Sequence, residues 1–372
     1  QRQMCIRDRT SAVATVKSDE LAATSVTSLD QGLQGRAAGV VVLNTSGQPG
    51  AGTSIRIRGT SSINGNNEPL YVIDGIPVIS DASSFSTGAL QNPALNPLTN
   101  INPNDIESIE ILKDASATAV YGVRGANGVV LVTTRRGKSG KLSINVKSNV
   151  EISYSARTPN YVDAPTYATL ANEASIVRGG RPVYNDAELR LFQTGLDPDL
   201  YPNVNWRDVM LKDYVWNHQH HISVNGGGSN ARYYMSVGIQ HKDAIYKQDK
   251  GIKNYDTNVG YNKYNFRANI DANLTKSTNL ELGLESVIVN NAFPGYGDNN
   301  QALWDAQANM TPVTVPVVYS DGTLPAYGAD ATQQNPYILL NYTGYKKKSE
   351  MTNSVRLKLI QDFDRWVNCI LY

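Results

Sequence analysis

The stretch "YNKYNFRANIDANL", residues 261–274, decides the fold because its side chains alternate strictly between two chemical characters. The even positions are apolar or aromatic: Tyr264, Phe266, Ala268, Ile270, Ala272 and Leu274. The odd positions are polar: Lys263, Asn265, Arg267, Asn269, Asp271 and Asn273. Side chains of a β-strand point to opposite faces in turn, so this pattern predicts a strand with one apolar and one polar face. Its length matches the ~9–11 residues that a tilted strand needs to cross a bilayer.

The same alternation recurs along the C-terminal two thirds of the chain, and we expect roughly six such strands. The others centre on residues 142–146, 222–224, 233–239, 280–288 and 355–359. Their connections alternate between long or medium and short, which is typical of an outer-membrane barrel with tight periplasmic turns and extended outer loops. A soluble domain rarely carries structureless loops this long. The pattern favours a barrel over the alternative, a soluble β-sandwich adhesin or carbohydrate-binding module, which would bury Phe266, Ile270 and Leu282.

The N-terminal part of the chain, up to about Gly140, has a different texture of short strands, small helices and Gly-rich turns. A helix is expected to begin at Ser28, because Gln31 follows at the spacing of a capping box. Its Leu29 and Leu33 are expected to face inward.

A glycine-rich segment, "GVRGANG" at residues 122–128, raises the possibility of a phosphate-binding loop. Such a loop lies between a strand and a following helix, whose N-terminus holds the phosphate. Here the order is reversed: Asp114 caps a short helix, Gly122 ends it, and residues 129–133 form the next strand. We therefore interpret these as turn glycines, like the hairpin turn predicted at Asp74-Gly75.

Composition excludes several function classes. A net charge of +1 with 18% charged residues gives no basic face for nucleic acid. Cys5 and Cys369 lie too far apart in sequence to suggest a metal cluster, and alternation places His218 and His220 on the face opposite His221. Catalytic motifs are not evident. We expect no enzyme activity, no cofactor and no metal.

Three segments carry a family resemblance. "NPNDIESIEILKDASATAVYGVRGANGVVLVTTRRGKSG" (102–140), "LQGRAAGVVVLNTSGQPGAGTSIRIRGTSSINGNNEPLYVIDGIPV" (33–78) and "HISVNGGGSNARYYMSVGIQHKDAIYK" (221–247) closely resemble SusC/RagA-type TonB-dependent outer-membrane receptors of Bacteroidetes. The resemblance implies an α+β plug domain inside a transmembrane β-barrel of the outer membrane. It also implies import of oligosaccharide or peptide fragments, with a SusD-like surface lipoprotein and the TonB complex as partners.

The resemblance implies two sets of candidate residues and a division of the chain. Polar contacts between plug and barrel wall are expected from Arg56, Arg58, Asp114 and Arg124, with an ordinary solvated strand face as the alternative. Trp206 and Trp304 are candidates for substrate contact in the outer loops, because aromatic faces can stack on sugar rings; the alternative is that they pack their own loops.

Residues 11–140 are assigned to the plug and residues 141–366 to the first strands of the barrel. Residues 1–10 are interpreted as a non-native tail, and residues 367–372 as an aberrant or truncated end. We expect a fragment without signal peptide or TonB box, with about sixteen strands of a barrel of ~22 missing. An open barrel of this kind is not expected to transport by itself.

Overall fold

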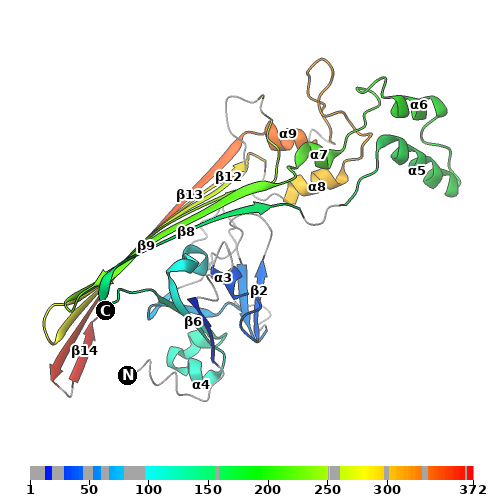
Figure 1. The fold of residues 1–372 in the computed structure, drawn as a ribbon. Helices are drawn as coiled ribbons and strands as arrows, with labels where there is room; N and C mark the ends of the chain where they lie inside the picture. The colour runs from blue at the N-terminus through cyan, green and yellow to red at the C-terminus, as the bar shows by residue number, and fades with distance from the viewer. Residues whose placement is uncertain are drawn as a thin grey trace.

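The computed structural model describes residues 13–18, 29–44, 53–59, 67–78, 97–155, 159–249, 251, 260–296, 301–328, 334–364 and 367–371. These residues form a small N-terminal α+β domain and one large sheet of long strands, with helices gathered at one end of that sheet (Figure 1). No helix within the described ranges has the length and apolar character needed to span a membrane.

The N-terminal domain is built on a five-stranded sheet of order β1-β6-β7-β4-β5, in which β4 and β7 are parallel, and a separate β2-β3 pair. Its strands are β1 (Val13–Lys17), β2 (Val40–Asn44), β3 (Thr53–Ile57), β4 (Leu70–Ile73), β5 (Ile76–Val78), β6 (Ile106–Leu112) and β7 (Val129–Thr134). Its helical segments are α3 (Leu29–Leu33), η2 (Pro97–Asn100), η3 (Pro103–Asp105), α4 (Ala115–Thr118) and η4 (Ala119–Gly125).

Apolar alternation builds the core of this domain. Ile55 of β3 and Ile109 of β6 are fully buried and meet α3, whose Leu29 and Leu33 face inward as predicted. The predicted capping residue Ser28 lies outside the described residues. The hairpin turn is confirmed, because Asp74 and Gly75 both have positive φ, the conformation that a tight two-residue turn requires.

The helix after Asp114 differs from the prediction at its N-cap. Asp114 occupies the N-cap position of α4, but its side chain makes no capping hydrogen bond and pairs with Arg58 instead. Gly122, with φ 59° and ψ −146°, has a non-helical conformation that interrupts the helical segment as predicted, and one further helical turn then reaches Gly125. The strand then follows as expected.

The large sheet has seven antiparallel strands in sequential order, from β8 to β14. They are β8 (Gly140–Ser153), β9 (Val215–Gly227), β10 (Ala231–Asp243), β11 (Gly260–Asn273), β12 (Thr278–Pro294), β13 (Tyr345–Asp364) and β14 (Val367–Leu371). The last of these, set apart in the sequence interpretation, pairs with β13.

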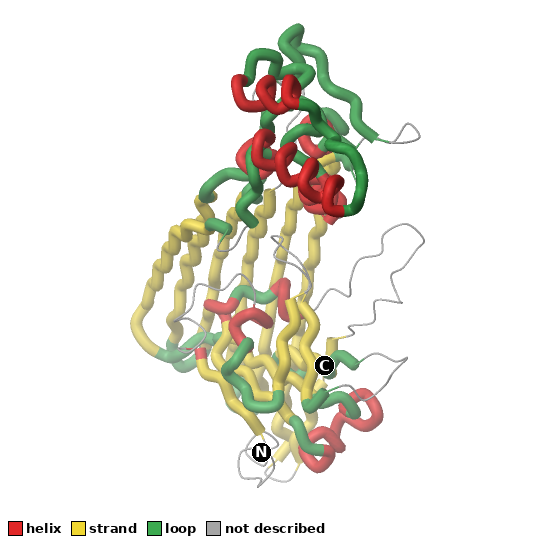
Figure 2. Tube along the Cα trace, turned by 90° about the vertical axis from the view of Figure 1, so that its right-hand side faces the viewer, coloured by secondary structure: helices red, strands yellow, loops and turns green. Residues whose placement is uncertain are grey.

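The two faces of the large sheet are those that alternation predicts. On β11, Tyr264 and Phe266 are 42% and 44% exposed, whereas Lys263 and Asn269 on the other face are 1% exposed. Ala268 is buried too, on the outward face between its register neighbours Met235 and Leu284. The N-terminal domain covers the polar face (Figure 2), and within the described residues no second sheet covers the apolar one. The fold is therefore a domain set against the start of an antiparallel membrane barrel, and the sandwich alternative is wrong.

The long connections contain helices and are not structureless. They hold α5 (Ala164–Val177), α6 (Asp186–Thr194), α7 (Trp206–Met210), α8 (Gln301–Asn309) and α9 (Pro336–Asn341). All five lie at the end of the sheet opposite its short turns (Figure 2). Three of them, α7, α8 and α9, pack around a shared apolar cluster that includes Met210, Leu303 and Leu339.

Candidate functional site

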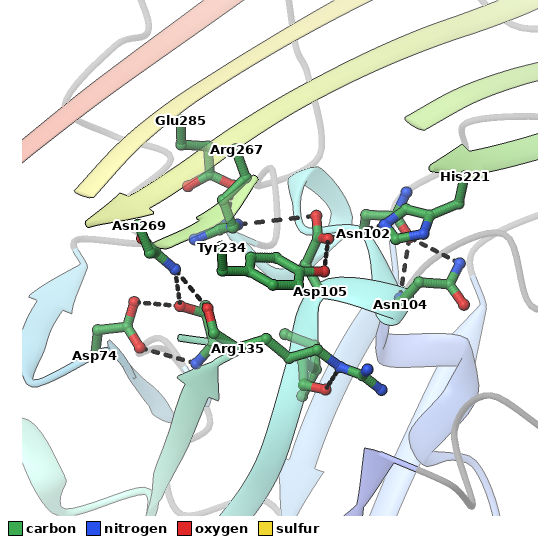
Figure 3. A network of polar contacts seen from close by, with 12 residues as sticks. Asp74, Asn102, Asn104, Asp105, Arg135, His221, Tyr234, Arg267, Asn269 and Glu285 are labelled. Atoms are coloured by element: carbon green, nitrogen blue, oxygen red, sulfur yellow. Dashed lines mark hydrogen bonds and ion pairs between the residues drawn. The ribbon is translucent and has the colours of Figure 1, made fainter. Parts of the chain in front are cut away.

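The interface between the N-terminal domain and the polar face of the large sheet is the candidate functional site (Figure 3). The domain reaches the sheet through η2, η3, the β4-β5 turn and the segment 135–139 that joins β7 to β8. The contacts between the two bodies are mostly hydrogen bonds and ion pairs.

Asp105, at the end of η3, is the centre of the interface. Its Oδ1 accepts hydrogen bonds from His221 Nε2 at 2.9 Å and from the Tyr234 hydroxyl at 2.8 Å. Arg267 Nε lies 3.9 Å from Oδ2. Burial by itself raises the pKa of Asp105, but the hydrogen bond and charge of His221, with the charge of Arg267, outweigh it and hold the pKa below its ordinary value. The carboxylate is therefore ionised, and His221 must be the donor.

The local sequence around η3 places Asp105 on the sheet. Asn102 caps this 3-10 turn, accepting a hydrogen bond from the backbone nitrogen of Asn104 at 3.0 Å. On the sheet side, a Cβ at Gly238 would overlap the Asn102 side-chain nitrogen, so glycine permits this close approach. Lys147 of β8 donates to the Asn104 side chain at 3.2 Å.

Two buried cations of β11 complete this part of the interface. Arg267 pairs with Glu285 of β12 in addition to Asp105. Lys263 is almost fully buried and donates to the backbone carbonyl of Thr99 at the end of η2. Each charge is thus matched by a charge or a hydrogen bond, as burial requires.

Asp74 forms a second contact from the β4-β5 turn. Its carboxylate accepts from the backbone nitrogen of Thr134 at 2.8 Å and from the Thr134 hydroxyl at 2.7 Å. Arg356 of β13 pairs with the same carboxylate at 2.7 Å. Burial raises the pKa of Asp74, but Arg356 and the Thr134 hydrogen bonds overcome that effect, so its pKa is lowered. Asp74 therefore joins the β4-β5 turn both to β7 and to the large sheet.

The segment after β7 is held tightly as it enters β8. Asn269 donates to the backbone carbonyl of Arg135 at 2.7 Å. Arg136 pairs with Asp271 at 2.5 Å and with Glu281 at 2.9 Å, two acidic residues that lie opposite each other on β11 and β12. A Cβ at Gly137 would overlap the backbone nitrogen of Tyr233, so only glycine fits there without a shift.

The residues proposed from the sequence as plug–wall contacts occupy a different part of the domain. Arg58 and Asp114 form an ion pair with each other at 2.5 Å, between β3 and the start of α4. Arg56 lies beside Val41 on the β2-β3 pair, and Arg124 lies on η4. The interface described above is made by other residues, and contact of these four with a barrel wall stays a prediction.

The two loop tryptophans differ in their surroundings. Trp206 is 4% exposed and donates from its indole nitrogen to the Thr311 carbonyl at 3.1 Å, so it packs the loops together. Trp304 on α8 is 39% exposed, with its ring 6.0 Å from that of Tyr246. Of the two, Trp304 has a face available to a ligand.

The histidines divide between the faces as alternation predicts. His221 is buried against the N-terminal domain, whereas His218 and His220 lie exposed on the apolar side of the sheet. Within the parts of the chain that the structure describes, no group of three or more His, Cys, Asp or Glu is placed to hold a metal ion.

Known proteins match this chain in sequence and in fold. The family model described as TonB-dependent Receptor Plug Domain matches residues 6–129. The TonB-dependent receptor P26 of Formosa agariphila is 36% identical over 322 residues, which are 85% of this chain and 28% of that protein. The TonB-dependent receptor SusC of Bacteroides thetaiotaomicron is 36% identical over 242 residues, covering 64% of this chain and 22% of SusC. The chain belongs to the SusC/RagA-type TonB-dependent receptors.

A solved structure supports the same fold. The structure of the RagAB peptide importer in its closed-closed state aligns over 96% of this chain and 39% of that chain, with a TM-score of 0.71 and 22% identity. The N-terminal domain is thus the plug, the large sheet is the start of the barrel wall, and the protein is one of the outer membrane. These relatives are described as receptors or importers, not as enzymes.

Sequence reasoning missed the residues that join plug and wall. Asp74 was interpreted only as a turn residue, and Asp105 and Arg356 were not singled out. The polar face of each wall strand could have been used, because it predicts which wall residues face the plug. It does not predict which plug residues contact them.

Proposed function

We propose that the receptor to which this chain belongs imports oligosaccharide or peptide fragments across the outer membrane. In this proposal the plug closes the lumen, a SusD-like surface lipoprotein captures the substrate, and the TonB complex supplies the energy. The support is the family assignment, together with one solved relative that is described as a peptide importer.

The observation that carries the proposal is the polar character of the interface between plug and wall. Asp74, Asp105 and Arg136 each pair with cations or anions of the wall strands. A polar interface can exchange its contacts for water, whereas an apolar one exposes hydrophobic surface when it opens. Such contacts suit a plug that is held in place at rest and released for passage.

The helices at the outer end of the wall are the proposed substrate side. Trp304 is the aromatic side chain proposed to contact substrate there, since Trp206 serves as packing. Arg56, Arg58, Asp114 and Arg124 are proposed to meet wall surfaces other than the interface described here.

The test uses the full-length receptor in its host. Deletion of its gene is expected to abolish uptake of fluorescent oligosaccharides or of fluorescent peptides, and re-expression should restore it. A protonophore should block uptake while leaving surface binding unchanged, because only transport needs TonB. Uptake of both classes at wild-type levels in the deletion strain would refute the proposal, and binding without energy-dependent uptake would mean a binding protein instead.

A further inference from the structure

A row of polar side chains crosses the lipid-facing side of the wall near its outer end. The strand register places five residues side by side on five neighbouring strands: His218, His241, Asn262, Asn290 and Ser349. We call this set the outer polar row. It shares a strand face with exposed apolar residues such as Val237 and Met351, so it faces away from the plug.

The members of the outer polar row are ordered by contacts with one another. The rings of His218 and His241 stack with centroids 6.3 Å apart and planes at 16°. His241 Nδ1 lies 2.6 Å from Asn262 Oδ1, and Ser349 donates to Asn290 Oδ1 at 2.7 Å. His220 also stacks with His218, with ring centroids 6.4 Å apart. The row is therefore an ordered set of polar groups rather than scattered polar residues.

Charge and aromatic rings border the outer polar row. Lys347 lies two residues before Ser349 on β13, on the same face and nearer the outer end of the strand. Its Nζ is 5.3 Å from the centre of the Tyr345 ring. At the other border Trp216 is half exposed on β9. Asp243, whose Oδ1 lies 3.3 Å from His241 Nε2, is an acidic neighbour. Imidazole, amide and hydroxyl groups beside an ammonium group are suited to phosphate and sugar oxygens.

The opposite end of the lipid-facing side has a different character. There the register aligns Ala231, Ala272, Leu280 and Leu359 on strands β10 to β13, all apolar. The outer polar row lies at the end with the long loops, which is the outer end of such a barrel, whereas the other end carries a shorter polar pair, Thr278 and Gln361. An outer membrane is itself asymmetric: its outer leaflet is built of phosphorylated glycolipid, and its inner leaflet of phospholipid.

From this juxtaposition we infer that the outer polar row, with Lys347, is a binding site for the phosphorylated headgroup of an outer-leaflet glycolipid. The acyl chains would lie over the exposed apolar residues below the row. The inference depends on the outer-membrane location of the family and not on the proposed import activity.

The experiment is native mass spectrometry of the full-length receptor, extracted from outer membranes in mild detergent, then stripped of lipid and titrated. The titrants are lipid A, lipid A with its phosphates removed, phosphatidylethanolamine and inorganic phosphate. We expect lipid A to bind, and the variants H218L/H241L and Lys347→Glu to bind it about tenfold more weakly, the change expected when a charge-assisted hydrogen bond is lost. Leucine suits a lipid-facing strand position, so we expect H218L/H241L to fold.

Asn353→Leu is the matched control, because Asn353 points to the same side of β13 but lies within the apolar band beside Ser286. It should bind lipid A as the wild type does. Equal binding by the row variants and the wild type would overturn the inference. So would equal binding of dephosphorylated lipid A or phosphatidylethanolamine, or displacement of lipid A by inorganic phosphate alone.

Discussion

Asp105→Asn tests whether the interface holds the plug in place. Asp105 is 2% exposed and receives hydrogen bonds from His221 and Tyr234, while Arg267 faces its other oxygen. Asparagine keeps the shape of the side chain but removes its negative charge, so the buried Arg267 guanidinium would face a neutral amide in place of a carboxylate. Loss of one partner of a buried charge costs about 3–5 kcal/mol. We expect about 3 kcal/mol, because Arg267 keeps Glu285 as a partner.

The assay is hydrogen exchange of the full-length receptor, followed at the slowest amides of β6 and β7. Release of the plug breaks the contacts of Asp105 with His221, Tyr234 and Arg267, so the variant should lower the free energy of release. A decrease of about 3 kcal/mol corresponds to about a hundredfold loss of protection from exchange. Glu107→Gln is the matched control, because it removes one exposed carboxylate two residues away. Equal protection in the two variants would refute the reasoning that this buried contact secures the plug.

Three further predictions follow from the same interface. Gly137→Val should lower the yield of folded receptor, measured by heat-modifiable gel migration, because the valine side chain would overlap the backbone of Tyr233. Gly228→Ala is the control and should leave the yield unchanged, because the space around Gly228 is open. The stability that Asp74 contributes should be complete above its ordinary pKa of ~3.9 and should be lost as the pH falls through its lower folded-state pKa. The midpoint of urea unfolding should therefore depend less on pH, at the acid end, in Asp74→Asn than in the wild type. Arg136→Gln should destabilise the receptor in urea by about 1–2 kcal/mol, because it leaves the carboxylates of Asp271 and Glu281 facing each other. Adding Glu281→Gln should restore part of that stability. If the double variant showed no recovery, repulsion between the two carboxylates would be unimportant.

Local periodicity was sufficient to predict much of the architecture. The alternation around Phe266 fixed which face of β11 meets lipid, and the same period correctly separated His221 from His218 and His220. The hairpin at Asp74-Gly75 was also local, since it depends on two residues that accept positive φ. The helices of the outer loops were missed, although α6 carried a local signal in the capping box formed by Asn185 and Glu188.

The pairing of plug with wall could not be predicted, because it joins residues that are remote in sequence. Tyr234 lies 129 residues from Asp105, and Arg356 lies 282 residues from Asp74. Alternation identifies a polar strand face, but the partner of each side chain depends on how the two bodies dock. Asp114 illustrates the same limit within the plug, where the tertiary contact with Arg58 replaced the local cap that its position favours.

The short segment between β7 and β8 constrains how a passage can open. Only residues 135–139 separate the last plug strand from the first wall strand. Asn269 holds this segment by a hydrogen bond, and Asp271 and Glu281 hold it by ion pairs. These contacts anchor the junction itself, so breaking the contacts of Asp105 and Asp74 alone would leave the plug fastened to the wall at this point. In the import that we propose, a solute would pass the plug on the side away from this anchor.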